Sequence, residues 1–199
     1  MELKANTVPI GVDYKNISSP PGGILMWIVI FLEVITFGLG LMGLAYYGRL
    51  EPQLFHESRL QLNVTLGSVN TVILLTSGFF MARAVQRFKV GDIKTTLLNF
   101  NLTLIGGGLF IVIKAFEYYT KLEAGLGMDT NMFFTSYWLL TGFHLVHVLV
   151  GMVILGWIMF LMKRPNSDLN REDVEAGAAF WHMCDLIWLL LFPALYLIF

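Results

Sequence analysis

Side chains that could do chemistry are few in this chain, and seven of them lie inside or at the edge of long apolar stretches. Ionisable groups are costly in hydrocarbon, so each of the seven is a candidate for a functional role. They are Glu33, Lys114, Glu117, His144, His147, His182 and Asp185. Glu33 lies near the middle of MWIVIFLEVITFG. A carboxyl group there could relay a proton or could be hydrogen-bonded to a neighbouring helix.

Two histidines, His144 and His147, are three residues apart in TGFHLVHVLVG and would share one face of a helix. That spacing would suit a metal site, and either imidazole could ligate haem together with His182 on another helix. A di-iron bundle would need Glu-x-x-His motifs on several helices, and the sequence contains none. The simpler interpretation is that the imidazoles form hydrogen bonds across helices.

Two further pairs have the same spacing. His182 and Asp185 lie in FWHMCDLIW, where they could pair with each other or with ionisable groups on other helices. No Gly-x-Ser-x-Gly or His-Glu-x-x-His motif accompanies them, so a membrane hydrolase is not predicted. Lys114 and Glu117, in VIKAFEYY, are interpreted as an interfacial ion pair. The alternative is a site for a partner protein or a lipid headgroup.

The elements that position these residues follow from the composition. Of 199 residues, 56% are hydrophobic and 14% are charged, against about 45–50% and about 25% in soluble domains. Five stretches of 19 to 33 residues contain only Glu33 and Asp185 among the 27 charged residues, and about 20 apolar residues cross a bilayer. The sequence predicts an all-α integral membrane bundle of five transmembrane helices and excludes a soluble globule.

Charge and cysteine content exclude other classes. The net charge is −1 and no basic block is present, so nucleic-acid binding is not expected. Cys184 is the only cysteine, which excludes a disulfide or a cysteine-rich metal cluster within one chain. The first 22 residues lack the features of a secretory signal, so the first helix is expected to be retained.

The expected organisation is one transmembrane domain over 23–199, preceded by a polar segment over 1–22. Its helices are expected at about 24–47, 60–82, 95–118, 132–162 and 176–199, with residues 49–59 forming a polar connection. Seven small or polar residues in the second helix, and Gly106 to Gly108 in the third, predict close helix packing there. Nine Lys and Arg residues fall on the N-terminal side and four on the other, which predicts a cytoplasmic N terminus and an external C terminus.

Several segments together resemble subunit III of the haem-copper respiratory oxidases. The resemblance covers Gly23 to Phe199 and is most specific in FFTSYWLLTGFHLVHVLVG at 133–151 and AAFWHMCDLIWLLLF at 178–192. MWIVIFLEVITFG carries the intramembrane Glu of that family, NTVILLTSG at 70–78 is similar to its Asn-Thr and Ser-Gly pattern, and KAFEYY provides a Glu followed by an aromatic residue. The chain resembles the short, five-helix bacterial form.

Two residues differ from the oxidase pattern. Lys114 occupies a position where oxidase members more often have Gln, and the last helix contains Pro193 in FPALYL. Both features are closer to the subunit-III-like accessory protein of bacterial nitric oxide reductases.

The resemblance implies a non-catalytic subunit in a bacterial inner membrane. Such a subunit packs on a catalytic subunit I-like partner, binds phospholipid, supports proton uptake and protects the complex during turnover. Haem and copper, or non-haem iron, are expected only in the partner. Glu33, His144, His147, His182 and Asp185 are expected to form one interhelical hydrogen-bonded set. The alternatives are a haem-binding electron carrier that uses His144 or His147 with His182, and a small proton-coupled transporter that uses Glu33 and Asp185.

Overall fold

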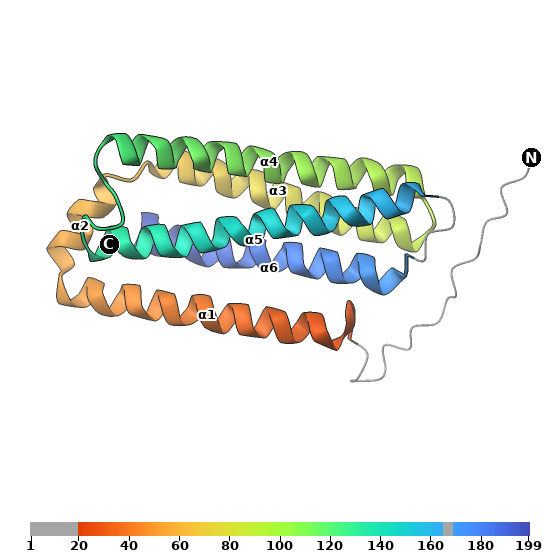
Figure 1. Cartoon of the computed structure of the whole chain (residues 1–199), viewed down its shortest axis with the longest axis horizontal. Coiled ribbons are helices and arrows are strands. Elements are labelled where there is room, and N and C mark those ends of the chain that lie inside the picture. Colours follow the sequence, from red (N-terminus) through yellow and green to blue (C-terminus); the bar gives the residue numbers. More distant parts are fainter. Residues whose placement is uncertain (1–19, 165–168) are drawn as a thin grey trace, which may run out of the picture.

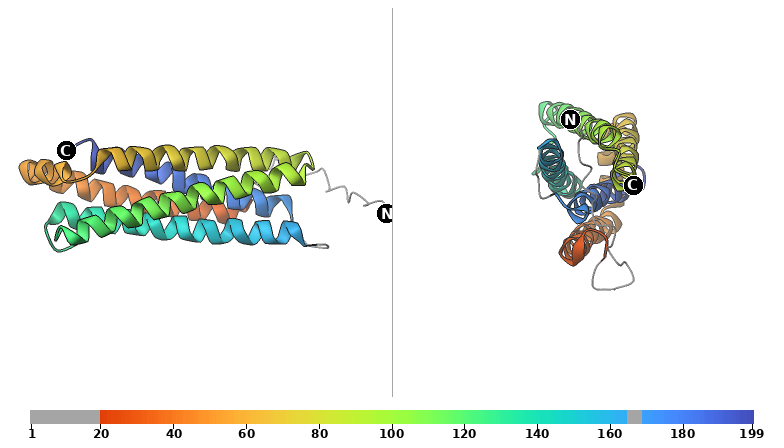
Figure 2. Two further views of the ribbon diagram at one scale, coloured as in Figure 1. Left: turned by 90° about the horizontal axis from the view of Figure 1, so that it is seen from above. Right: turned by 90° about the vertical axis from the view of Figure 1, so that its right-hand side faces the viewer.

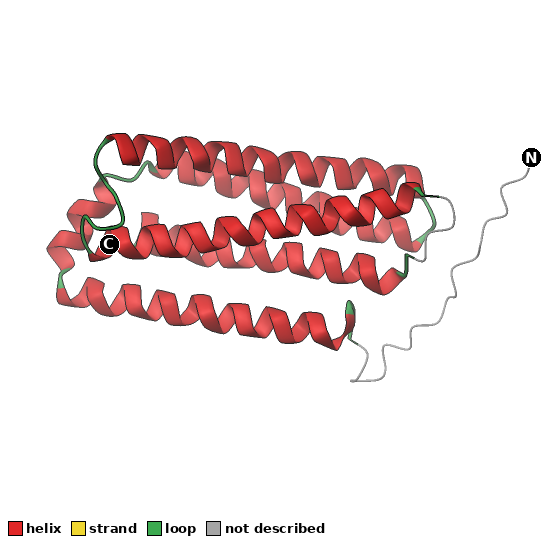
Figure 3. Ribbon diagram, viewed as in Figure 1, coloured by secondary structure: helices red, strands yellow, loops and turns green. Residues whose placement is uncertain are grey.

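The computed structural model describes residues 20–164 and 169–199 and, over those ranges, contains six helices and no strand (Figure 3). Five long helices lie side by side as a bundle, and a short helix lies across one end (Figure 1). In chain order they are α1 (Gly23–Leu50), α2 (Pro52–Leu60), α3 (Val64–Lys89), α4 (Ile93–Glu123), α5 (Met132–Lys163) and α6 (Arg171–Tyr196). All but α2 are long and apolar enough to cross a membrane. The predicted five-helix membrane bundle is confirmed, and the protein is a multi-pass membrane protein.

Most helix ends lie beyond the predicted limits, because charged residues mark the edge of the hydrocarbon rather than the end of a helix. Two ends lie inside them: α3 begins at Val64 rather than 60, and α6 ends at Tyr196 rather than 199. Helix starts are instead set by polar capping residues, whose side chains accept hydrogen bonds from free backbone N–H groups. Asn63 accepts from the Leu66 N–H, Asp92 from the Thr95 N–H and Asn131 from the Phe134 N–H. Hydrogen bonds from Thr95 also hold the pKa of the Asp92 carboxyl below its usual range.

Residues 49–59 contain a helix and are not only a polar connection. Pro52 opens α2, where its missing N–H costs nothing. Phe55 and Ser58 are buried, with the Phe55 ring packed edge-on against Phe133 at the start of α5. The side chain of Asn131 donates to the Ser58 hydroxyl at 3.0 Å. This end of the bundle is therefore closed by α2.

The right-hand view of Figure 2 shows α6 at the centre of the bundle and α1 at its edge. α6 contacts α3, α5 and α1, and α3 packs along α4. In the most apolar 18-residue stretch of each helix, 56% of the residues of α6 are buried, compared with 6% of the residues of α1. Glu175 and Asp185 of α6 are therefore buried against other helices, whereas α1 presents most of its apolar surface to its surroundings.

The predicted close packing of the second and third spans is confirmed for α3 and α4. The Ser77 hydroxyl donates to the Thr103 carbonyl at 2.9 Å, and the Thr103 hydroxyl donates back to the Ser77 carbonyl at 3.3 Å. A Cβ at Gly106 would lie 2.7 Å from Ser77, and one at Gly107 would lie 2.6 Å from Trp181. Gly108, in contrast, faces open space. Two of the three glycines thus permit close helix contact.

Candidate functional site

Glu33 of α1 and His147 of α5 face each other. Oε2 of Glu33 lies 3.1 Å from Nε2 of His147, and their side chains are 23% and 11% exposed. The other ring nitrogen of His147, Nδ1, is 2.8 Å from the Phe143 carbonyl oxygen. A carbonyl can only accept, so Nδ1 carries the proton in this contact. The nitrogen directed at Glu33 is therefore Nε2.

The 3.1 Å separation is within the range of an ion pair, but Oε2 of Glu33 is buried without a hydrogen bond among the described residues, so the two groups are close without being aligned. One further proton would bind to either Glu33 or His147. With Nδ1–H bonded to Phe143, the pair is neutral when the proton is on Glu33 and an ion pair when it is on His147. The net charge is zero in both cases, which limits the cost of placing the pair inside a membrane. The pair can hold one proton on either residue, and transfer between the two atoms requires the side chains to realign into a hydrogen bond.

His144 lies one turn before His147 on α5 but has a different environment. It is fully buried, and neither ring nitrogen has a hydrogen-bond partner among the described residues. Its ring stacks on Trp188 with centroids 5.3 Å apart and meets the Phe110 ring edge-on at 5.7 Å. His144 is therefore part of an aromatic packing cluster.

His182 and Asp185 form a second pair on α6. Nδ1 of His182 lies 3.4 Å from Oδ2 of Asp185, and the carboxylate packs over Gly78 of α3. The His182 side chain is 43% exposed and that of Asp185 is 9% exposed. The other carboxylate oxygen, Oδ1, is buried without a hydrogen-bond partner in the described parts of the chain.

The single hydrogen-bonded set expected from the sequence is therefore divided in the structure. Glu33 pairs with His147, and His182 pairs with Asp185. His144 joins neither pair by a hydrogen bond. Residues three apart do share a helix face, but the rotation of α5 and α6 in the bundle places the two faces against different neighbours.

Lys114 and Glu117 of α4 form an ion pair with an Nζ–Oε2 distance of 3.0 Å. Both are almost completely buried rather than at the edge of the bundle. Two phenols join them from other helices. Lys114 Nζ donates to the hydroxyls of Tyr137 on α5 at 3.2 Å and of Tyr196 on α6 at 2.8 Å. These hydroxyls donate in turn to Oε1 of Glu117 at 2.9 and 2.6 Å.

This four-residue network uses all three donor hydrogens of the ammonium group. It also supplies both carboxylate oxygens of Glu117 with donors, so neither charge is left uncompensated. Tyr137 and Tyr196 are not among the site residues predicted from the sequence. The signal that could have found them is chemical: a Lys–Glu pair inside a span needs further hydrogen-bonding partners, and tyrosines on neighbouring spans are the natural donors.

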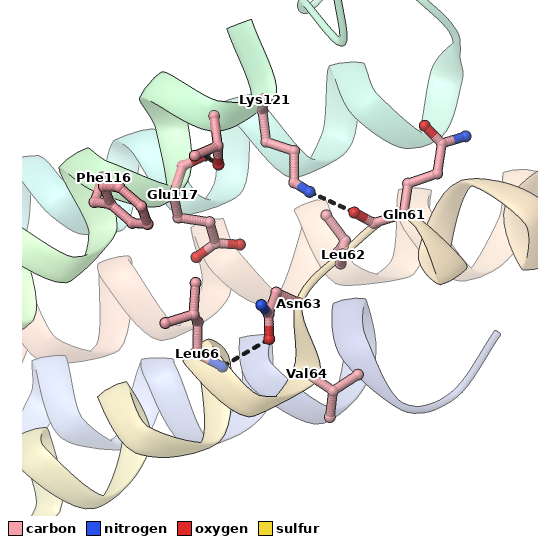
Figure 4. Close-up of a pocket in the computed structure, with 9 residues that line it drawn as sticks. Gln61, Leu62, Asn63, Val64, Leu66, Phe116, Glu117 and Lys121 are labelled. Carbon is pink, nitrogen blue, oxygen red and sulfur yellow. Dashed lines mark hydrogen bonds between the residues drawn. The ribbon is translucent and has the colours of Figure 1, made fainter. Parts of the chain in front are cut away.

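Glu117 also lines a pocket of about 520 Å³ at the α2 end of the bundle. Figure 4 shows Glu117 and Lys121 directed from α4 toward the segment that joins α2 to α3. The Lys121 ammonium donates to the Gln61 carbonyl, and Asn63 caps α3 beside it. The pocket wall therefore combines an ammonium group, a carboxyl group, hydroxyl and amide groups, and apolar side chains.

Over residues 20–164 and 169–199, no group of three or more His, Cys, Asp or Glu side chains is arranged to hold a metal ion. The three histidines of the haem-binding alternative have different surroundings: His144 is enclosed by aromatic rings, His147 faces Glu33, and His182 is partly exposed beside α3.

The family model and the relatives found by comparison with known proteins indicate the same family. The family model for cytochrome c oxidase subunit III matches residues 57–198. The cytochrome c oxidase subunit 3 of Synechocystis is 29% identical over 88% of this chain and 74% of that protein, and that of Thermostichus vulcanus is 26% identical over 98% and 96%. The heme-copper oxidase subunit I+III of Aeropyrum pernix is 31% identical over 87% of this chain, which spans 22% of that longer protein.

The family model covers α3 to α6, including both histidine segments and the buried ionisable network of Lys114 and Glu117. The resemblance noted from the sequence motifs is therefore confirmed by a match over more than half of the chain. The chain belongs to the cytochrome c oxidase subunit III family, the third-subunit family of the haem-copper oxidases.

Proposed function

We propose that the protein is a non-catalytic subunit of a bacterial haem-copper respiratory complex, in which it supports assembly, proton uptake and sustained turnover. Its partner would be a subunit I-like protein that carries the haem and the copper or non-haem iron. Family membership supports the complex, and a relative named as a fused subunit I+III supports this partner. Relatives from bacteria support a location in the inner membrane.

The observation that carries the proton role is the Glu33–His147 pair. It joins α1 to α5 near the middle of both spans, and its two heteroatoms are 3.1 Å apart. Glu33 remains 23% exposed at its side chain, so the proton it holds can be exchanged with a group outside this chain. Delivery of this proton to the partner leaves the pair with one negative charge, so a second proton has to reach Glu33 or His147 before the next transfer.

The test compares sustained turnover of the purified complex with wild-type chain, with Glu33→Gln and with Glu51→Gln. Glu51 is an exposed glutamate between α1 and α2 and serves as the matched control. We expect Glu33→Gln to leave the partner's haem spectrum and the amount of complex unchanged and to lower sustained turnover. The expected loss of about tenfold is less than the roughly 10²–10⁴-fold contributed by a general acid or base that acts on the reacting group itself, because Glu33 lies outside the catalytic subunit. Unchanged turnover in Glu33→Gln would contradict a role for Glu33 in proton transfer.

The cytoplasmic N terminus is part of the same proposal. The C-terminal ends of α3 and α5 and the first turns of α4 and α6 lie at one end of the bundle (Figure 1), and these are the segments that carry most Lys and Arg residues. At the α2 end, Lys114 and Lys121 are largely buried. The difference in exposed positive charge between the two ends supports placing the α4 start in the cytoplasm.

Phospholipid binding is assigned to the pocket that Glu117 and Lys121 line, with Lys121 facing the headgroup phosphate. Lys114, also a candidate headgroup residue, has all its donors occupied inside the bundle, so it positions Glu117 instead. Counting bound phosphorus in the delipidated complex tests this. Lys121→Gln should lose about one phospholipid per chain, and Lys94→Gln, at the other end of α4, should lose none.

The partner's substrate, oxygen or nitric oxide, distinguishes a terminal oxidase from a nitric oxide reductase of denitrification. The Lys114 network and Pro193 within α6 are the features that support the nitric oxide reductase branch. Metal analysis of the purified complex decides: haem with copper identifies an oxidase, and haem with non-haem iron and no copper identifies the reductase.

A further inference from the structure

The His182–Asp185 pair is incomplete within the chain. Asp185 is 7% exposed, yet its Oδ1 atom has no hydrogen-bond partner among the residues described. Among the described residues, Oδ2 has one hydrogen-bond partner, the Nδ1 atom of His182 at 3.4 Å, and that long distance is a weak hydrogen bond. Buried carboxylate oxygens are normally supplied with donors, so this pair lacks at least one partner.

The position of the pair makes the missing partner more significant. His182 and Asp185 lie near the middle of α6, and Gly78, over which the carboxylate packs, lies near the middle of α3. Both helices have the length and hydropathy of membrane spans. The 43% of the His182 side chain that is exposed would therefore meet hydrocarbon at about the depth where polar groups cost most.

The surrounding surface has the character of a helix-docking face. Leu186 and Leu189 follow His182 at four and seven residues, so they share its face of α6, and both are exposed. On α3, Leu75 and Phe79 are exposed within one turn of Gly78. A polar centre with an apolar border is the pattern by which membrane helices associate through packing and interhelical hydrogen bonds.

We propose that the α3–α6 face centred on His182 and Asp185 is the docking surface for a transmembrane helix of the subunit I-like partner, which supplies a hydrogen-bond donor to Asp185. This proposal rests on the proposed function and specifies which face of the chain meets the catalytic subunit. The choice of occupant rests on two facts. The unsatisfied groups require a polar side chain at mid-membrane depth, and the relative from Aeropyrum pernix is named as a single protein with subunits I and III.

Site-specific photocrosslinking in membranes that contain the whole complex tests the face. A benzophenone side chain is placed at one of two positions. Leu186 is 49% exposed and lies on the proposed surface, whereas Val153 is 73% exposed and lies on α5. Figure 2 shows that helix α5 lies away from α3. We expect a crosslink to the haem-bearing partner from position 186 and none from position 153. A crosslink from 153 alone, or equal crosslinks from both, overturns the proposal.

Copurification of the partner shows whether a negative crosslinking result contradicts the proposed docking face or the proposed function. If the partner copurifies but position 186 gives no crosslink, the face is wrong and the subunit role stands. If no haem protein copurifies under mild detergent, the proposed function fails.

Substitution of His182 provides the second measurement, with chain level in the membrane as the folding control. His182→Phe should reduce the partner retained in detergent by about threefold to tenfold, the effect of one interhelical hydrogen bond. His182→Gln, which keeps a donor and an acceptor, should recover most of it. Full retention in His182→Phe would contradict the polar contact.

Discussion

Two buried ionisable clusters in this bundle differ in how completely the chain satisfies them. In the cluster of Lys114, Glu117, Tyr137 and Tyr196, three helices supply donors for both carboxylate oxygens and acceptors for all three ammonium hydrogens. In the His182–Asp185 pair, one carboxylate oxygen has no partner in the described chain and the imidazole is partly exposed. The first cluster is complete within the fold, and the second needs another protein.

The difference has an energetic meaning. A buried ion pair barely repays its desolvation unless additional hydrogen bonds satisfy both charges. The Lys114 network meets that condition with its two tyrosines, so its main role is to fix α4, α5 and α6 relative to one another. The His182–Asp185 pair does not meet it, so its retention has to be explained by an interaction outside the chain.

The largest effect should come from breaking the complete cluster. Lys114→Met leaves the Glu117 carboxylate buried without its cation, which should lower the free energy of unfolding by about 3–5 kcal/mol. Titration of the purified chain with a denaturing detergent, followed by circular dichroism, measures this.

The controls for this variant are chosen by burial and charge. Lys163→Met, at the exposed end of α5, should change the free energy of unfolding by less than about 0.5 kcal/mol. The double variant Lys114→Met/Glu117→Gln removes both charges and should recover much of the loss. If Lys114→Met alone were as stable as the wild type, the network would not stabilise the fold.

An intermediate effect should come from the helix contact that supports the incomplete pair. A Cβ at Gly78 would overlap the Asp185 carboxylate, whereas one at Gly108 would meet nothing within 4 Å. Gly78→Ala should therefore destabilise the chain by about 1–3 kcal/mol. Gly108→Ala should be neutral or stabilising by up to about 1 kcal/mol, because Ala favours a helix more than Gly does. The same titration measures both, and equal effects would refute close α3–α6 packing at Gly78.

The smallest effect on the isolated chain is expected for Asp185→Asn. Among the described residues the carboxylate makes one weak hydrogen bond, to His182, and Asn keeps the shape that packs over Gly78, so the free energy of unfolding should change by less than about 1 kcal/mol. Retention of the partner in detergent should nevertheless fall, because the acceptor at the proposed interface is altered. A large loss of stability with normal retention of the partner would reverse the distinction between the two clusters.

Much of the architecture could be predicted from the sequence because each span is a local property. Five charge-poor stretches predicted five spans, and Asn63, Asp92 and Asn131 mark helix starts with short-range hydrogen bonds that the charge pattern did not consider. The missed helix α2 is short and polar, and it is stabilised by burial of Phe55 against residues far along the chain.

The clusters were only partly predictable because their members come from distant parts of the chain. His182–Asp185 and Lys114–Glu117 are local pairs that helical spacing identifies. Glu33–His147 joins the first span to the fourth, and no spacing rule connects them. Tyr196 is 79 residues from Glu117 in sequence and still donates to it. Such contacts depend on how each helix is rotated in the bundle.

By itself, the sequence determined that this is a five-span membrane protein of the subunit III family with a few ionisable groups in its spans. The length of an apolar stretch and a sequence motif are both properties of residues that are close together in the chain. Only the tertiary structure decided which groups pair, because rotation and contact between helices set every partner distance. It enclosed Lys114 in a complete network, directed His147 to Glu33, and left Asp185 with an unpartnered oxygen within the described chain.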